Sequence, residues 1–304
     1  IKLMHAQQGK VFVSMGGNFL AAAPDTSLTK DAMENCQMTV HVSTKLNRSH
    51  LHHGEIGLIL PCLGRTDKIV EASGEQKLTV ENSMGIVHST RGNMEPRSKF
   101  LLSEPHIIAQ IAAKTVGNKI VDWTSLIDNY DRIRDLISKS IKGFESFNEK
   151  LKNEKIFELP NGPREGVFTN DIGKARFTTN ALSNHQLEKD ELLMMTIRSH
   201  DQFNTTIYGM DDRYRGIYGI RKVVLMNSMD IKHLGLNLDS TVTIYNEYLH
   251  IRREVKEFTI VPYDIPQGCV ATYFPECNPL IPISQTARKS NTPASKSIKV
   301  RIRN

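Results

Sequence analysis

The sequence predicts an α/β region followed by a compact β-barrel. A strand–helix–strand pattern near the start fits within the roughly 30 residues of a βαβ unit. Two helical patterns follow between residues 103 and 143. After Glu191 the pattern changes to short apolar strands separated by turns, which is typical of a small barrel. A chain of 304 residues is long enough to form both parts around sizeable cores.

The first region alternates strand and helix. An apolar, β-branched run ends at the double glycine Gly16–Gly17, and residues 37–43 form a second such run. Between them, residues 26–36 are expected to form a helix with Thr26 as its N-cap. A further short strand is expected at 57–61. This order favours a parallel sheet.

Two helices are expected next. Ser103 caps the first, and Pro105 lies in its first turn, where the missing N–H costs little. The second is expected to run from residue 122 to a stop at Gly143. Its apolar side chains recur at helical spacing, which indicates core packing rather than a cofactor site. These side chains are Trp123, Leu126, Ile127, Tyr130, Ile133, Ile137 and Ile141.

The helical pattern weakens between residues 148 and 191, where Pro and Gly at turn spacing predict a loop with short hairpins. We therefore divide the chain into an α/β region with its linker at 1–189 and a barrel at 190–304. The strands expected in the barrel are 191–197, 222–227, 240–246, 249–261, 268–274 and 297–303.

Charge and cysteine spacing narrow the classes of partner. The formal charge of +6 and the pI of about 9.0 favour anionic partners. No basic block with interleaved aromatic residues points to nucleic acid. The four cysteines lie far apart, which argues against a structural zinc or an iron–sulfur cluster within this chain. With no signal peptide and no long apolar run, we expect a cytoplasmic protein that does not span a membrane.

The double glycine is the first candidate for ligand binding. Gly16 and Gly17 would let backbone amides approach a phosphate or a ring closely, and Asn18 could hydrogen-bond a base or a sugar. A plain tight turn is the alternative. The stretch is not the GxGxxG fingerprint, so an ordinary dinucleotide fold is not supported.

A polar loop follows the second strand and contains three further candidates. Ser43, Thr44 and Asn47 are suited to contact a polar ligand. Three nearby histidines, at positions 50, 52 and 53, are poorly spaced for a metal site, and a solvated loop explains them better.

The segment 195–209 crowds donors just past an apolar strand. Arg198 stands beside hydroxyl and amide side chains, a combination suited to a pyrophosphate and the edges of a heterocycle. A polar surface hairpin is the alternative. No nucleophile–base–acid series is present, so we assign no catalytic residue and interpret the segment as a binding surface.

Several motifs in sequence order resemble the formate-dehydrogenase-like alpha subunits of the DMSO reductase family of molybdopterin oxidoreductases. The segments 195–209, 223–244, 265–282 and 293–300 resemble the cofactor-capping domain of that family. The segments 11–26, 42–51 and 58–67 resemble the second half of its cofactor-binding α/β domain.

The resemblance implies a double-psi barrel that closes over two molybdopterin guanine dinucleotides, whose dithiolenes hold a metal, usually molybdenum. In the family a 4Fe-4S cluster and the metal-ligating residue belong to an amino-terminal half. This chain, which begins without an initiator Met, therefore resembles the carboxyl-terminal portion, and a deliberately shortened chain is the alternative. Alone it should be inactive. Formate is the substrate that the resemblance suggests, with an electron-transfer partner.

The resemblance also selects cofactor-binding positions. The glycine turn matches the family's MGxN/D turn, whereas Ser43 stands where many members have aspartate. The segment 196–205 matches a T-x-R…T run, Asn278 matches an asparagine near the pterin, and Lys296 matches a carboxyl-terminal lysine. The complete set is Met15, Gly16, Gly17, Asn18, Ser43, Thr44, Asn47, Thr196, Arg198, Ser199, Gln202, Asn204, Thr205, Asn278 and Lys296.

A second hypothesis stays open at this stage. The same two domains could form a non-catalytic module that binds a nucleotide or pterin. An upstream region that encodes a cysteine cluster and a second pterin-binding half would exclude it.

Overall fold

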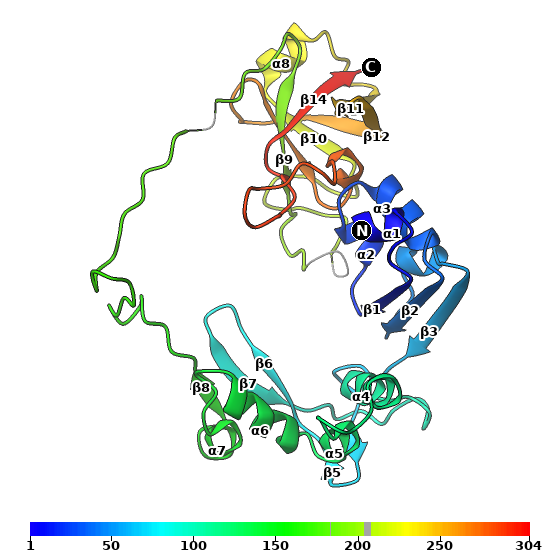
Figure 1. The fold of residues 1–304 in the computed structure, drawn as a ribbon. Coiled ribbons are helices and arrows are strands. Elements are labelled where there is room, and N and C mark those ends of the chain that lie inside the picture. Colours follow the sequence, from blue (N-terminus) through cyan, green and yellow to red (C-terminus); the bar gives the residue numbers. More distant parts are fainter. Residues whose placement is uncertain (183, 204–207) are drawn as a thin grey trace. The chain divides into compact units, whose positions relative to one another are not determined.

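The structure is a computed structural model that describes residues 1–182, 184–203 and 208–304. The chain forms two compact units (Figure 1). Unit 1 combines Ile1–Leu60 with Ser183–Asn304, and unit 2 is Pro61–Leu182. The predicted domain boundary at 189/190 remains a prediction, because the two compact units are divided at other positions, after Leu60 and after Leu182.

Unit 1 begins with a small three-stranded sheet that contains a parallel pair of strands. Strands β1 (Val11–Met15), β2 (Met38–Ser43) and β3 (Ile56–Pro61) form a sheet in the order β1-β2-β3, and Val13 pairs with Val40 in the parallel register. Helices α1 (Lys2–His5), α2 (Phe19–Ala22) and α3 (Thr26–Glu34) and the 3-10 helix η1 (Arg48–Leu51) accompany it. The strand–helix–strand prediction is confirmed.

The predicted N-cap of α3 is wrong by one residue. Asp25 occupies the N-cap in a left-handed conformation with φ 51°, and Thr26 is the first helical residue. The carboxylate of Asp25 does not cap the helix because it pairs with Arg253 of the barrel, with 2.7 Å between Oδ2 and Nη2. A tertiary ion pair therefore displaces the local capping preference.

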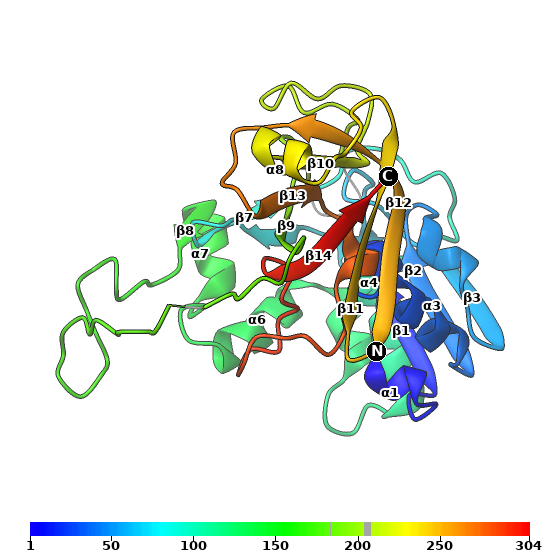
Figure 2. The same cartoon turned by 90° about the horizontal axis from the view of Figure 1, so that it is seen from above.

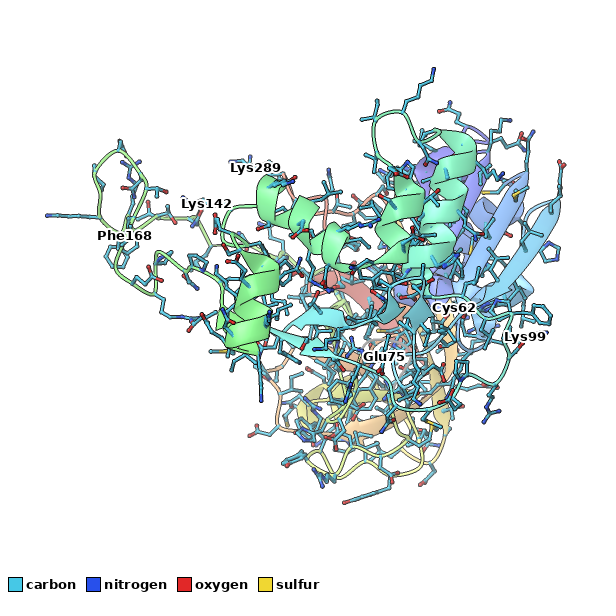
Figure 3. All side chains as sticks on the ribbon, turned by 90° about the horizontal axis from the view of Figure 1, so that it is seen from below. Cys62, Glu75, Lys99, Lys142, Phe168 and Lys289 are labelled. Carbon is cyan, nitrogen blue, oxygen red and sulfur yellow. The ribbon has the colours of Figure 1, made fainter. Side chains whose placement is uncertain are left out.

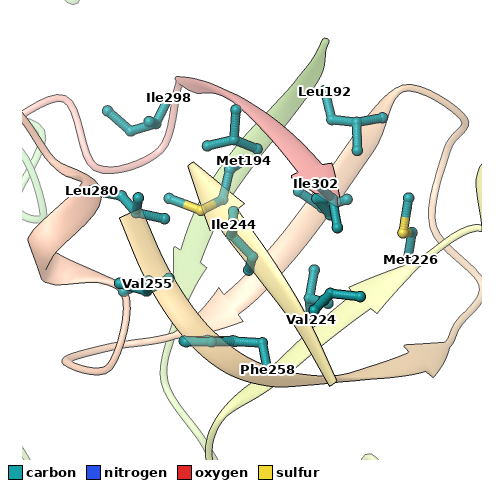
Figure 4. Close-up of a cluster of buried hydrophobic side chains, with 14 of the residues drawn as sticks. Leu192, Met194, Val224, Met226, Ile244, Val255, Phe258, Leu280, Ile298 and Ile302 are labelled. Atoms are coloured by element: carbon teal, nitrogen blue, oxygen red, sulfur yellow. The ribbon is translucent and has the colours of Figure 1, made fainter. Parts of the chain in front are cut away.

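The rest of unit 1 is a closed six-stranded barrel in the order β10-β12-β11-β14-β9-β13. Its strands are β9 (Leu192–Ile197), β10 (Val223–Met226), β11 (Thr241–Tyr248), β12 (Ile251–Pro262), β13 (Cys269–Tyr273) and β14 (Ile298–Arg303), and helix α8 (Ser228–His233) follows β10. Alternate side chains point inward, so that Met194, Ile244 and Phe258 meet in one buried cluster (Figure 4). The predicted barrel is confirmed.

Buried polar contacts join the barrel to the first sixty residues. Besides the Asp25–Arg253 pair, the Asn278 amide donates to Ala21 O at 2.6 Å, and the Asp25 N–H donates to Asn278 O at 3.0 Å. Asn278 belongs to the 3-10 helix η2 (Asn278–Leu280), which follows β13. These contacts explain why residues 1–60 and the barrel form one unit.

Unit 2 contains a hairpin, a second small sheet and four helices, and its ribbon is coloured from cyan to green in Figure 2. Strands β4 (Val70–Glu71) and β5 (Gly74–Glu75) pair with each other, whereas β6 (Leu78–Glu81), β7 (Ile86–Thr90) and β8 (Ile156–Glu158) form a sheet in that order. The helices are α4 (Glu104–Thr115), α5 (Trp123–Asp128), α6 (Asp131–Ser140) and α7 (Phe147–Asn153).

The helix expected between residues 122 and 143 is two helices. The chain leaves helical geometry at Asn129, whose side chain accepts from the Asp131 N–H and so starts α6. The Tyr130 N–H donates instead to the Gln76 side chain at 2.9 Å. Pairing the backbone with a distant side chain therefore breaks a pattern that is continuous in sequence.

The structure confirms one further expectation in unit 2 and corrects another. Ser103 caps α4 as predicted, since its Oγ accepts from the His106 N–H. The interval 148–191, expected as loop and hairpins, contributes α7 and the edge strand β8, whose Phe157 packs with Val87 and Phe147.

Among the helices of the described chain, none combines the length and apolar character needed to cross a bilayer.

Candidate cofactor-binding site

The glycine turn follows β1 and opens toward a cavity of unit 1. Gly16 and Gly17 both have positive φ, 62° and 69°, which suits glycine. A Cβ on Gly17 would meet no atom within 4 Å, so this backbone faces open space. The Gly16 N–H donates to Val42 O at 2.8 Å, which fixes the turn against β2.

The loop after β2 braces this turn. The Asn47 amide donates to Gly17 O at 2.7 Å, and the Ser49 hydroxyl donates to Asn18 Oδ1 at 3.2 Å. The same hydroxyl accepts from the Leu20 N–H at 3.0 Å. Asn47, predicted as a ligand contact, thus holds the turn in place.

The cavity beside the turn has a volume of about 560 Å³. Four predicted residues line it, namely Met15, Gly16, Gly17 and Asn18. The sequence analysis missed its aromatic walls, which are Phe12, Phe19 and, from the barrel, Phe274. Such a mixture of aromatic surface and open backbone is suited to a flat ring that carries polar substituents.

Phe274 connects this cavity to the end of β9. The guanidinium of Arg198 lies 5.9 Å from the centre of its ring, and the Gln202 amide donates to its carbonyl at 2.7 Å. Arg198 is exposed and Gln202 is buried. The structure therefore brings together the glycine turn and the donor-rich segment, which are about 180 positions apart in the sequence.

A buried arginine that the sequence analysis missed organises the donor-rich segment. Arg221 is 4% exposed and donates to both carboxylate oxygens of Glu276, at 2.6 and 3.1 Å. It also donates to Ser199 Oγ at 2.7 Å, to Gln202 Oε1 at 3.1 Å and to Phe274 O at 2.9 Å. Ser199 and Gln202 thus serve the interior of the site rather than presenting free donors.

A second ion pair fixes the backbone at Arg198. Arg215 donates to Arg198 O at 3.2 Å and to Asp212 Oδ2 at 2.5 Å, and the Tyr273 hydroxyl donates to the same carboxylate at 2.8 Å. Burial alone would raise the pKa of Asp212, but the hydrogen bonds from Arg215 and Tyr273 outweigh it and lower the pKa. Asp212 is therefore ionised in this network.

Thr196, near the end of β9, contacts Lys296, which lies just before β14. The Lys296 ammonium donates to Thr196 O, and the Thr196 N–H donates to Ser295 O at 2.9 Å. Thr196 is buried beside Thr272 of β13. This pair joins the segment before β14 to β9.

The remaining predicted residues lie in different surroundings. Ser43 turns back on its own loop, where its hydroxyl donates to Lys45 O at 2.6 Å, and Thr44 is exposed. Neither lines the cavity. Asn278 is 1% exposed, and its Oδ1 has no hydrogen-bond partner within the described part of the chain. Asn204 and Thr205 lie outside the described residues.

The histidines near the turn are less solvated than expected. The rings of His50 and His41 lie 4.6 Å apart, and the Nε2 atoms of both are buried without a partner among the described residues. His50 Nδ1 accepts from the Asn47 N–H, and His52 Nδ1 lies 2.9 Å from Glu34 Oε1. Burial, with a further contribution from His50, lowers the pKa of His41, so it is neutral near pH 7.

Comparison with known proteins assigns the barrel. Residues 192–299 match the family described as Molydopterin dinucleotide binding domain. The chain carries a molybdopterin dinucleotide binding domain. The predicted resemblance to molybdopterin oxidoreductases is thereby confirmed.

Some relatives of this chain are named as oxidoreductases. An uncharacterized oxidoreductase of Mycobacterium tuberculosis is 44% identical over 309 residues, which is 99% of this chain and 40% of the relative. Protein YdeP of Escherichia coli is 36% identical over 304 residues, which is 97% of this chain and 40% of YdeP. The chain thus spans about two fifths of the length of the curated relatives it matches.

A solved structure shares the fold of this chain. Acetylene hydratase from Pelobacter acetylenicus aligns with a TM-score of 0.62 at 13% identity, over 99% of this chain and 45% of that chain. The likeness extends beyond the barrel to the α/β parts. At this identity it concerns the fold and not the reaction.

Proposed function

We propose that unit 1 holds the nucleotide end of a molybdopterin guanine dinucleotide between the glycine turn and Phe274. One observation carries the proposal: the barrel matches a family of molybdopterin dinucleotide binding domains, and its Phe274 lines the same cavity as Gly16, Gly17 and Asn18. Arg198, over the ring of Phe274, supplies a cation for the pyrophosphate.

The geometry suits one arm of the cofactor. A cavity of about 560 Å³ lies within the range of small-molecule pockets and has room for a nucleotide rather than for two complete dinucleotides. The aromatic walls suit a base, and the open backbone at Gly17 suits close approach of a phosphate. Outside this cavity, the buried Oδ1 of Asn278 has no partner among the described residues, and it offers an acceptor to an N–H or O–H of another part of the cofactor.

The predicted residues then divide by role. We propose direct contact for Met15, Gly16, Gly17, Asn18 and Arg198. A supporting role falls to the residues whose polar atoms are engaged within the chain, namely Asn47, Thr196, Ser199, Gln202 and Lys296. We propose that Ser43, Thr44, Asn204, Thr205 and Asn278 contact other parts of the cofactor.

We further propose that the whole protein is a molybdenum oxidoreductase with two such dinucleotides, whose capping barrel is of the double-psi type. When bound, the cofactor supplies the redox chemistry, and the chain supplies orientation and electrostatics. The family resemblance favours formate as the substrate, an electron-transfer partner, a 4Fe-4S cluster held outside this chain and a cytoplasmic location. The 304-residue chain alone should be inactive, since it would make only part of the cofactor contacts.

Substitution of Arg198 tests the proposal. In the longest polypeptide in which this sequence occurs, Arg198→Ala should lower the affinity for the dinucleotide about ten- to a hundredfold, the worth of one charge-assisted hydrogen bond. Arg288→Ala is the matched control, because Arg288 is an exposed arginine of the same unit outside the cavity. Equal cofactor content in the two variants would refute the role of Arg198.

A further inference from the structure

A second cavity lies wholly within unit 2, and the proposed cofactor site makes no use of it. Its volume is about 1080 Å³. Residues from β7, β8, α6 and α7 line it, together with Lys77 just before β6. Glu75 of β5, which belongs to the same unit, is labelled in Figure 3.

The walls of this cavity are rich in positive charge. Five cationic side chains line it against two carboxylates, and one of these, Asp131, is already paired with Arg134. A concave surface of one sign concentrates oppositely charged ligands. The cations are Lys77, Arg91, Arg134, Lys152 and Lys155.

Arg134 supplies a second, independent observation. It is 7% exposed, and it donates to Asn148 Oδ1 at 2.7 Å, to Lys77 O at 3.0 Å and to Asp131 Oδ1. A guanidinium carries five N–H donors. Each of its three nitrogens makes one described hydrogen bond, so two of the five N–H groups are left to donate to a ligand in the cavity that Arg134 lines.

We propose that this cavity binds a phosphate-bearing small molecule. The free donors of Arg134 and the ammonium groups of Lys152 and Lys155 would hold the phosphate, and the hydroxyls of Ser89 and Thr90 add neutral donors. The volume exceeds that of a lone phosphate, and Leu151 and Ile156 offer an apolar surface for an organic part. This inference does not rest on the proposed function of unit 1.

Titration calorimetry of the 304-residue chain with ADP, inorganic phosphate and adenosine tests the proposal. ADP should bind, inorganic phosphate should compete with it, and uncharged adenosine should not bind. The double substitution Lys152→Ala/Lys155→Ala should weaken ADP binding about tenfold, because each lysine contributes one exposed ionic contact. Both lysines are exposed and make no described ion pair, so the double variant should fold.

Two controls separate this site from others. Lys119→Ala removes an exposed lysine of the same unit outside the cavity and should leave ADP binding unchanged. In an Arg198→Ala background, which removes the pyrophosphate contact proposed for unit 1, the lysine double substitution should still weaken ADP binding about tenfold. Adenosine binding as tightly as ADP, no binding of ADP or phosphate, or a lysine double variant that binds ADP like the wild type would each overturn the proposal.

Discussion

Substituting Arg221 should open the donor-rich side of the candidate site. Arg221→Met keeps much of the volume and the apolar stem but removes the guanidinium. Five of its six described hydrogen bonds tie together Glu276, Ser199, Gln202 and the backbone at Phe274. The variant should therefore destabilise unit 1 and loosen the loop that carries Arg198.

The magnitude follows from what the substitution leaves behind. The side chain of Glu276 is only 17% exposed, so its carboxylate would remain largely desolvated and unpaired. Breaking a buried ion pair from one side costs about 3–5 kcal/mol, and the partial exposure of Glu276 places the expected cost near the lower end. The second substitution Glu276→Gln should restore part of this loss, because it removes the stranded charge.

Thiol labelling of Cys277 gives a local assay. Cys277 is fully buried next to Glu276, whereas the one tryptophan, Trp123, lies in unit 2 and does not report on unit 1. In the regime where closing outpaces labelling, a loss of about 3 kcal/mol accelerates labelling roughly a hundredfold. Peptide mapping by mass spectrometry assigns the label to Cys277.

Lys222→Met is the matched control for Arg221→Met. Lys222 is the next residue along the chain, and its pair with Glu257 is exposed on both sides, so its loss should cost under about 1 kcal/mol. Equal labelling rates in the two variants would refute the assignment of Arg221 as the organiser of this segment. A Glu276→Gln double variant no more stable than Arg221→Met would refute the stranded-charge explanation.

Three further predictions concern the same unit and its cysteines. Gly17→Ala should cost about 1–2 kcal/mol in denaturant unfolding because φ is +69°, although no atom lies within 4 Å of the new Cβ; a neutral effect would mean that the turn relaxes. The pKa of His41 is depressed below its ordinary 6.5, so the unfolded chain binds more protons there, and the stabilising effect should be complete above pH 6.5 and fall as the pH drops below it. His41→Phe should therefore flatten this part of the plot of melting temperature against pH. An unchanged slope would contradict the prediction. Under native conditions a thiol reagent should modify the partly exposed Cys269 first, because burial raises the pKa of Cys62 to about 11 and that of Cys277 to about 12. Modification of Cys62 or Cys277 before Cys269 would contradict the structure.

The sequence predicts most of what depends on local pattern. Alternating apolar residues give the barrel strands, and the double glycine gives a turn that needs positive φ. Ser103 caps its helix because the capping bond joins residues three apart.

The remaining features depend on partners that are distant in the sequence. Asp25 replaces Thr26 as the N-cap because it pairs with Arg253, 228 positions away. Phe274 joins the glycine turn only through folding, and Arg221 stands in an unremarkable basic pair in the sequence. Ser199 and Gln202 attract attention as donors, yet their bonds are used inside the protein, which no spacing rule reveals.

The most direct test of the central claim is the pterin and nucleotide content of the protein, expressed as the longest polypeptide in which this sequence occurs. Acid release followed by mass spectrometry should yield an oxidised molybdopterin derivative and GMP, and the amount of both per chain should fall in Arg198→Ala but not in Arg288→Ala. Wild-type protein that carries neither pterin nor GMP, after expression in a host that makes the cofactor, would contradict the account.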